Sequence, residues 1–225
     1  MFSLETHLAL TLLIPLLGGI GVFLFGSMPN LRESATLGAA ALLFLNVLVI
    51  LQSVLSGTYA QVDLIDTLPG LGISLKVEPL GMIFACVAST LWIINSLYSI
   101  GYMRGNKEAN QTRFYICFTI AISAAMGIAF AENLLTLFIF YEVLSLSTYP
   151  LVTHKGNDAA LKGGRIYLGI LLGTSIGLFL PAIIWVWTVT GTTDFTAGGI
   201  LAGHVGAGMT ASCYFCLCME LARLP

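Results

Sequence analysis

Long stretches without a charged residue are the feature that most limits how this 225-residue chain can fold. A helix that crosses a membrane needs about 20 consecutive residues that are mostly apolar. Six uncharged stretches reach or approach that length: 8–30, 34–62, 79–103, 114–131, 166–193 and 195–219. A further stretch, 133–154, is interrupted by one charged residue, Glu142. The sequence therefore predicts a chain that crosses a membrane several times.

The composition agrees with this interpretation. Hydrophobic residues make up 57% of the chain and charged residues 9%, whereas about 25% of the residues in an ordinary soluble domain are charged. So few charges cannot cover the surface of a soluble protein of this size. The formal net charge of −2 also leaves no basic patch for nucleic acid. We therefore predict an integral membrane protein without a nucleic-acid partner.

The positions of the charges define seven predicted spans and their direction. The spans lie near residues 7–26, 34–56, 79–102, 113–131, 133–153, 165–188 and 205–221. Alternating loops then place eight of the nine basic residues on one side of the membrane and only Lys76 on the other. Basic residues accumulate on the cytoplasmic side, so we expect a protein of the cell (inner) membrane with its N-terminus outside. The predicted fold class is all-α, a polytopic transmembrane helical bundle of about seven spans.

The loop between the second and third predicted spans, residues 57–78, has a pattern of its own. Pro69, Gly70 and Gly72 are typical turn residues. The residues that follow, 73–78, alternate apolar and polar side chains, which is typical of a half-buried strand. We expect a short hairpin in this loop, on the outer face of the membrane.

Glu142 is the one charged residue expected in the middle of a span. It lies ten residues after Glu132 and thirteen before Lys155. At about 1.5 Å per residue these separations correspond to roughly 15 and 20 Å along a helix. An acidic side chain at that depth costs about 2.5–3.5 kcal/mol, because desolvation favours its neutral form. A carboxyl group held between desolvation and a nearby cation can take up and release a proton, so we predict that Glu142 is a proton carrier.

Two hydroxyls extend this candidate site. Ser145 and Tyr149 lie three and seven residues after Glu142, on the same face of a helix, where they can hold water beside the carboxyl. The alternative is a permanently protonated Glu142 that makes one structural hydrogen bond between helices. Glu132 lies in the tight turn before this span and is expected to be solvated.

Other polar residues are weaker candidates for a proton path. Lys162 and Arg165 begin the sixth predicted span, and His154 ends the fifth. For each of them, a solvated position at the membrane interface is the competing interpretation. The three cysteines within 213–218 lack further ligands at the spacing that metal sites use. We therefore predict no metal site and no cofactor.

The sixth predicted span carries a ridge of glycines. Gly169, Gly173 and Gly177 recur every four residues and share one helix face. Such ridges allow a partner helix to approach closely, so we predict helix packing there. Chance is the alternative in a chain with 24 glycines.

Two segments of the chain have a recognisable pattern. They read Asn95-Ser-Leu-Tyr-Ser-Ile-Gly-Tyr-Met103 and Phe130-Ala-Glu-Asn-Leu-Leu-Thr-Leu-Phe-Ile-Phe-Tyr-Glu-Val-Leu-Ser-Leu-Ser-Thr-Tyr149. These segments resemble the antiporter-like membrane subunits that Mrp-type cation/proton antiporters, respiratory complex I and membrane-bound hydrogenases share. The continuation over residues 149–156, 164–169 and 172–175 is most similar to the D subunits of Mrp antiporters. The resemblance runs from about residue 5 to residue 209 and is most specific over residues 130–175.

The resemblance implies a fold and a site. Family members place a proton-handling glutamate in their fifth helix, in the same aromatic setting, and Glu142 matches it. The hairpin after the second helix is also a family feature. The resemblance further implies that residues 1–110 hold the N-terminal transmembrane helices with the outer loop, and that residues 111–225 begin the proton-conducting antiporter-like domain.

The resemblance also implies a function. We expect a subunit of a multisubunit monovalent cation (Na+)/proton antiporter, and so a membrane transporter subunit rather than an enzyme. Its expected partners are other membrane subunits, protons, monovalent cations and the lipid bilayer. Two alternatives stay open. One is a proton-translocating, non-catalytic membrane subunit of an NADH-quinone oxidoreductase (complex I) or hydrogenase. The other is a truncated fragment that does not transport.

The end of the chain departs from the family. Family members carry a lysine in the seventh helix, within a Gly-x-x-Lys-Ala-Ala-like run. Here the corresponding place reads Cys218-Met-Glu-Leu-Ala-Arg-Leu-Pro225, without that lysine, and the resemblance is lost from Thr210 onward. We hypothesise that a truncated or frameshifted reading frame produces this tail.

Sequencing of the encoding DNA past this point tests the hypothesis. We expect an intact frame that encodes the family lysine in a shifted register. If no such frame follows, the hypothesis is wrong.

Overall fold

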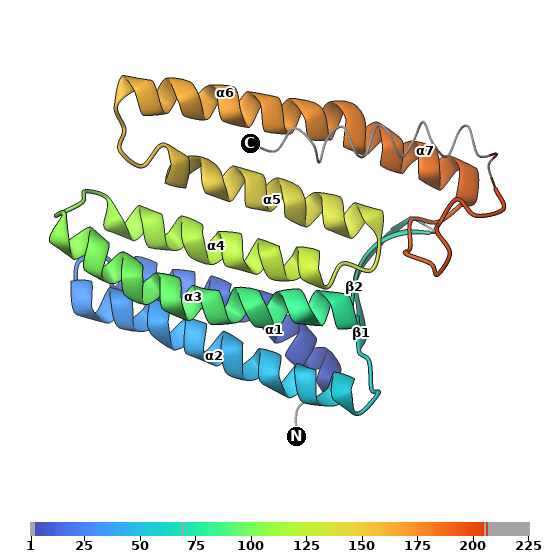
Figure 1. The fold of residues 1–225 in the computed structure, drawn as a ribbon, viewed down its shortest axis with the longest axis horizontal. Helices are drawn as coiled ribbons and strands as arrows, with labels where there is room; N and C mark the ends of the chain where they lie inside the picture. The colour runs from blue at the N-terminus through green and yellow to red at the C-terminus, as the bar shows by residue number, and fades with distance from the viewer. Residues whose placement is uncertain (1–2, 69, 205, 207–225) are drawn as a thin grey trace.

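The structure, a computed structural model, describes residues 3–68, 70–204 and 206. Long helices lie side by side, and a β-hairpin lies across one end of them (Figure 1). In chain order the elements are α1 (Leu4–Leu24), α2 (Pro29–Leu55), β1 (Gln61–Leu68), β2 (Leu71–Lys76), α3 (Pro79–Gly105), α4 (Gln111–Ala129), α5 (Leu134–Val152), α6 (Asp158–Thr174), η1 (Ser175–Phe179) and α7 (Leu180–Thr190). The element η1 is a π-helix, and it joins α6 to α7 in one continuous helical segment.

Six helical segments within the described residues are long and apolar enough to cross a membrane. Five of them are α1 to α5, and the sixth is the continuous segment Asp158–Thr190. The predicted all-α bundle is confirmed, and the chain is a multi-pass membrane protein. The sixth span begins earlier than the predicted residue 165. The seventh predicted span, 205–221, lies outside the described residues except for residue 206.

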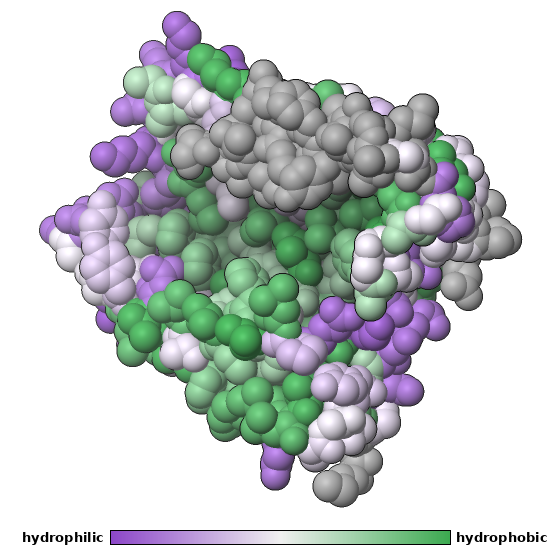
Figure 2. Space-filling model, turned by 45° about the vertical axis from the view of Figure 1, so that its right-hand side comes forward, coloured by the Kyte–Doolittle hydropathy of each residue, from purple (hydrophilic) through white to green (hydrophobic). Residues whose placement is uncertain are grey.

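The surface of the bundle suits a lipid environment. Figure 2 shows apolar residues across the middle of one face and hydrophilic residues toward its edges. Leu17, Phe23 and Leu97 are each more than half exposed although they are large and apolar. In water, extended apolar surface of this kind would drive aggregation, whereas lipid chains cover it at no such cost.

The helices pack through small residues and hydroxyls as well as through large apolar side chains. On α1, a Cβ added to Gly18 would lie 2.5 Å from the Cβ of Ala39 on α2. Helix α4 lies against both α1 and α5, and Ser123 of α4 donates a hydrogen bond to the carbonyl of Leu12 on α1 (2.9 Å). The predicted division of the chain at residue 110 stays a prediction.

A buried ion-pair network joins three helices at the end of the bundle opposite the hairpin, which we call the basic end. Glu33 of α2 is 4% exposed and accepts two hydrogen bonds from Arg104 of α3, at 2.9 and 2.6 Å. Arg32 lies 3.7 Å from the same carboxylate and donates to Gln111 (2.6 Å) and Thr112 (3.2 Å) of α4. Buried charges destabilise a fold unless they are paired and hydrogen-bonded, and both conditions are met here.

The predicted hairpin is confirmed at the opposite end. Strands β1 and β2 pair antiparallel, with Gln61 opposite Lys76 and Leu68 opposite Leu71. The burial of β2 differs from a strict alternation, because Ser74 and Leu75 are both buried. Ser74 is covered because β2 has a second neighbour on its other side.

That second neighbour is the turn between α4 and α5. The amide of Lys76 donates to the carbonyl of Phe130 (2.8 Å), which continues the ladder from β2 into the turn. On the far side of the turn, the amide of Leu134 donates to the carbonyl of Thr193 (3.0 Å). The turn is therefore held between β2 and residues 193–195. We call β2, residues 130–134 and residues 193–195 together the hairpin clasp.

Asn133 connects the hairpin clasp to the first turn of α5. As the N-cap of α5, its side-chain oxygen accepts a hydrogen bond from the amide of Thr136 (2.7 Å). Its side-chain nitrogen donates to the carbonyl of Gly72 (3.0 Å) and to Ser74 Oγ (2.9 Å). The amide of Ser74 in turn donates to Thr136 Oγ1 (3.0 Å). These bonds set the depth at which α5 begins, and so the depth of every residue along it.

Asn133→Ala tests this role. We expect loss of the cap, worth about 0.5–2 kcal/mol, together with loss of both bonds to the hairpin. Amide hydrogen exchange should therefore accelerate in the first turn of α5 and also in β2.

Asn157→Ala is the matched control. Asn157 caps α6 with the same geometry, accepting from the amide of Ala160 (2.8 Å), but it is exposed. Its loss should accelerate exchange only at the start of α6. Unchanged protection of β2 in Asn133→Ala would contradict the role of Asn133 in the clasp.

Candidate functional site

Glu142 lies near the middle of α5. It is eight residues after Leu134, the first residue of the helix, and ten before Val152, the last. At about 1.5 Å per residue, these separations are about 12 and 15 Å. The structure thus confirms that the residue predicted to lie at mid-span does so.

Two contacts show toward which helix the face of α5 that carries Glu142 is directed. Phe138, one turn before Glu142, packs edge-on against Phe179 of η1, with ring centroids 5.7 Å apart. Tyr149, two turns after Glu142, lies against Gly164 of α6, where an added Cβ would be 3.2 Å from the tyrosine ring. Residues spaced in this way share one face of a helix. Glu142 therefore lies on the face of α5 that is directed toward the sixth span.

The carboxyl group of Glu142 is incompletely satisfied. Its Oε1 atom is buried and has no hydrogen-bond partner among the described residues, while the side chain as a whole is half-buried. Ser145, one turn further along, is 4% exposed and donates its hydroxyl to the carbonyl of Tyr141 (2.9 Å). A buried carboxylate oxygen without a partner carries an uncompensated desolvation cost. The predicted roles of Glu142, Ser145 and Tyr149 stay predictions, although the structure brings the three to one helix face.

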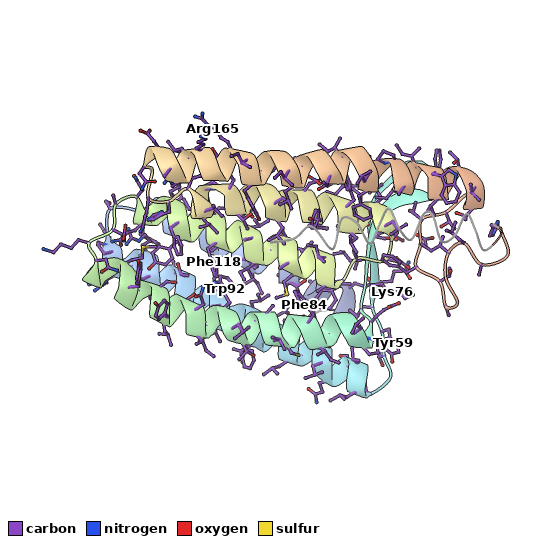
Figure 3. The ribbon with its side chains drawn as sticks, turned by 45° about the horizontal axis from the view of Figure 1, so that its top comes forward. Tyr59, Lys76, Phe84, Trp92, Phe118 and Arg165 are labelled. Atoms are coloured by element: carbon purple, nitrogen blue, oxygen red, sulfur yellow. The ribbon has the colours of Figure 1, made fainter. Side chains whose placement is uncertain are left out.

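The other predicted path residues lie at the basic end, away from Glu142. Lys162 and Arg165 are exposed near the start of α6, and Arg165 points away from the bundle in Figure 3. His154 follows the end of α5 and lies beside Phe114, with ring centroids 5.6 Å apart. Both ring nitrogens of His154 are buried without a hydrogen-bond partner in the described part of the chain. Participation of these residues in a proton path stays a prediction.

The predicted glycine ridge faces outward. A Cβ added to Gly169, Gly173 or Gly177 would meet nothing within 4 Å in the described residues, so helix packing on this ridge also stays a prediction. The glycine of α6 that does pack is Gly164, where a Cβ would collide with Thr153, the residue that follows α5. The four-residue spacing did not reveal this position, because Gly164 lies outside that series.

Glu132 is more enclosed than the sequence predicts. It is half-buried, and its Oε2 atom is buried without a partner among the described residues. Burial raises the pKa of Glu132, and the nearby charges of Asp194 and Asp63 raise it further, while a hydrogen bond with Ser74 and the charge of Lys76 lower it. The reason is that the turn lies between β2 and residues 193–195, which the sequence did not place side by side.

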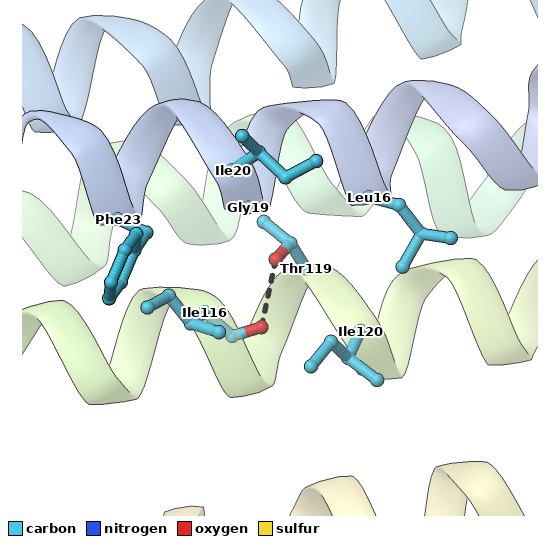
Figure 4. Close-up of a pocket in the computed structure, with 7 residues that line it drawn as sticks. All are labelled: Leu16, Gly19, Ile20, Phe23, Ile116, Thr119 and Ile120. Atoms are coloured by element: carbon cyan, nitrogen blue, oxygen red, sulfur yellow. Dashed lines mark hydrogen bonds between the residues drawn. The ribbon is translucent and has the colours of Figure 1, made fainter.

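Elsewhere the described residues offer no competing ion site. No group of three or more His, Cys, Asp or Glu side chains within them could hold a metal ion, and the cysteines within 213–218 lie outside them. A surface hollow of about 340 Å³ lies between α1 and α4 (Figure 4). It is lined by Leu16, Gly19, Ile20, Phe23, Ile116, Thr119 and Ile120. Its one polar side chain, Thr119, donates to the carbonyl of Ile116 (2.8 Å), so the hollow is apolar and holds no ionisable group.

Comparison with known proteins identifies the domain to which this site belongs. Residues 131–222 match the family described as NADH:quinone oxidoreductase/Mrp antiporter, TM. NADH-quinone oxidoreductase subunit N of Campylobacter jejuni (strain RM1221) is 32% identical over 136 residues, which cover 57% of this chain and 29% of that protein. Residues 131–222 therefore resemble the membrane domain of that family. Glu142 lies within the matched residues.

Solved structures share the fold of this chain. The Mrp complex from Dietzia sp. DQ12-45-1b matches with a TM-score of 0.76 and 19% identity, covering 98% of this chain and 41% of the other. Respiratory complex I from Thermus thermophilus matches with a TM-score of 0.67 and 20% identity, covering 94% and 43%. The chain therefore spans less than half the length of the relatives it matches.

Two features of the chain escaped sequence reasoning. Glu33 pairs with Arg104 although both lie in regions expected to be solvated loops or helix ends. Asn133 was not singled out, although an Asn directly before an apolar helical run is a recognisable N-cap signal. The partners of Asn133 on β2 could not be read from spacing, because they are about 60 residues away.

Glu132→Gln tests the enclosure of the turn through its pH dependence. Because folding raises the pKa of Glu132, the folded state holds this proton more tightly than the unfolded state does. The stabilising contribution is then complete at low pH and is lost as pH rises through the raised pKa. We expect Glu132→Gln and wild type to unfold at similar temperatures in detergent at acidic pH, and the variant to unfold at a higher temperature at alkaline pH.

Glu78→Gln is the control, because the Glu78 side chain is 56% exposed beside Lys76. That variant should gain no stability at alkaline pH. A difference between Glu132→Gln and wild type that stays constant across the pH range would contradict the argument.

Proposed function

We propose that this antiporter-like chain is a subunit of a multisubunit monovalent cation/proton antiporter that exchanges protons for Na+, with Glu142 as the proton carrier. One observation carries the proposal: a carboxylate oxygen is buried near the middle of a spanning helix with no hydrogen-bond partner in the described residues. A group used only to join helices would have its partner in place. A group that alternately holds and releases a proton needs a buried atom that is free to accept one.

The surroundings of Glu142 differ between the side of the hairpin clasp and the side of the basic end. This difference supports a proton path with a direction. The aromatic pair of Phe138 and Phe179 lies one turn away, on the side of the hairpin clasp. The hydroxyls of Ser145 and Tyr149 lie on the side of the basic end. Protons would then reach Glu142 from the basic end along hydroxyls, bind at Oε1 and leave past the aromatic pair when the helices shift. We place the N-terminus and the hairpin outside, because the basic residues of the loops gather at the other end.

A second candidate function is a proton-translocating membrane subunit of a complex I-type or hydrogenase-type complex. The 32% identity to an NADH-quinone oxidoreductase subunit N favours it. In both functions the partners are other membrane subunits and the lipid bilayer. The two differ in what drives the proton, which is a cation gradient in the first and electron transfer elsewhere in the complex in the second.

Proton exchange in everted membrane vesicles that contain the whole complex tests the role of Glu142. A positioned proton-transfer group contributes about 100-fold or more to a rate, so we expect Glu142→Gln to lower Na+-driven proton exchange at least about tenfold. The amount of assembled complex should stay unchanged, because the amide is neutral and of nearly equal size.

Glu5→Gln is the matched control. It is the same chemical change on an exposed carboxyl at the end of α1, and it should exchange at the wild-type rate. Normal exchange in Glu142→Gln would refute the proton-carrier role. Exchange that depends on NADH or another electron donor, and not on Na+, would favour the second candidate function.

A further inference from the structure

Two contacts align the sixth span with α5. Near the hairpin end, Phe138 of α5 packs against Phe179 of η1. Near the basic end, Thr153 at the end of α5 lies against Gly164 of α6. The two helical segments run antiparallel between these contacts (Figure 1). Residues of α5 and of the sixth span that lie at the same depth can therefore be found by counting from either contact.

Both counts pair Glu142 with Ser175. Along α5, Glu142 is four residues from the aromatic contact and eleven from the contact at the basic end. Along the sixth span, Ser175 is also four residues from the first contact and eleven from the second. The two residues thus lie at the same depth in the bundle.

Ser175 also lies on the face of the sixth span that meets α5. The buried side chains of this span include Leu171, Ser175, Phe179 and Ile183 in one row, and Phe179 of that row contacts α5. Ser175 is 0% exposed. A fully buried hydroxyl therefore lies level with the unsatisfied carboxyl and faces its helix.

The hydrogen bond that Ser175 makes is a weak one. Its hydroxyl donates to the carbonyl of Leu172 at 3.3 Å, beyond the 2.5–3.0 Å that is usual for such bonds. Ser175 is also the first residue of η1, where the amide of Leu180 donates to the Ser175 carbonyl five residues back. Such π-turns occur often at functional sites, and the next residue, Pro181, has no amide proton to donate. Turning the Ser175 hydroxyl away from its own helix therefore costs little.

We propose that Ser175 is a positioning residue for Glu142, whose carboxyl hydrogen-bonds to the Ser175 hydroxyl when it turns toward the sixth span. The proposal rests on the proposed function, since it gives Glu142 a polar partner on the facing helix. With this bond in place, the carboxyl is held in the orientation in which Oε1 accepts and releases its proton.

Infrared spectroscopy of the whole complex tests the proposal. The C=O stretching band of protonated Glu142 is the band that Glu142→Gln removes. Loss of a hydrogen bond moves such a band to higher frequency, so we expect this shift in Ser175→Ala. Proton exchange should fall about three- to tenfold, the effect of one lost hydrogen bond. Ser175→Thr, which keeps the hydroxyl, should restore both the band and the rate.

Ser89→Ala is the matched control. Ser89 of α3 is likewise 0% exposed and donates to the carbonyl three residues before it, that of Cys86 (3.1 Å). This variant should leave the band and the rate unchanged. The proposal is wrong if the band stays in place in Ser175→Ala, or if Ser89→Ala shifts it equally. If Glu142→Gln itself exchanges protons normally, the proposed function fails and not the placement of Ser175.

Discussion

The side chain of Asn133 is the interaction on which the placement of the site depends. It caps α5 and binds β2 at the same time, through bonds of 2.7, 3.0 and 2.9 Å. A small displacement of a helix along its axis in a bilayer has only a modest cost, because the bilayer adapts to the mismatch. A cap that is also bound to a strand removes that freedom. The bonds made at the start of α5 therefore set the depth of Glu142. They also set which residue of the sixth span lies level with it.

Both ends of the bundle are closed by polar interactions, and they differ in kind. At the hairpin clasp the groups are mostly backbone amides and carbonyls in a short ladder. At the basic end they are ionised side chains, with Glu33 bound by Arg104 and approached by Arg32. These bonds satisfy the groups that make them, as a region of low dielectric requires, whereas Glu132 Oε2 at the clasp and both ring nitrogens of His154 at the basic end have no partner in the described residues. Between the two ends, the Glu142 carboxyl is the acidic group left with an unpaired oxygen in the described residues.

Sequence reasoning succeeded where a single helix decides the answer. The spans follow from uncharged stretches, the hairpin from turn residues before 73–78, and the depth of Glu142 from its separation from Glu132 and Lys155. Each of these depends on residues close together along the chain. The enclosure of Glu132 depends instead on residues 193–195, which are brought beside it by the path of the sixth span. In the hydropathy pattern the sixth span is only another apolar stretch. The pattern therefore does not show which residues lie beside Glu132 in space.

The same limit explains why Ser175 was not recognised as a candidate site residue. Serine in an apolar helix commonly bonds back to its own chain, and the spacing within one span gives no reason to treat it otherwise. Its significance appears only when the contacts of Phe138 with Phe179 and of Thr153 with Gly164 align two helices. In the proposed function, a buried proton carrier needs a partner that binds it without holding it permanently. A hydroxyl on a long 3.3 Å bond to its own helix has that property, whereas an arginine such as the one bound to Glu33 would keep the carboxylate ionised.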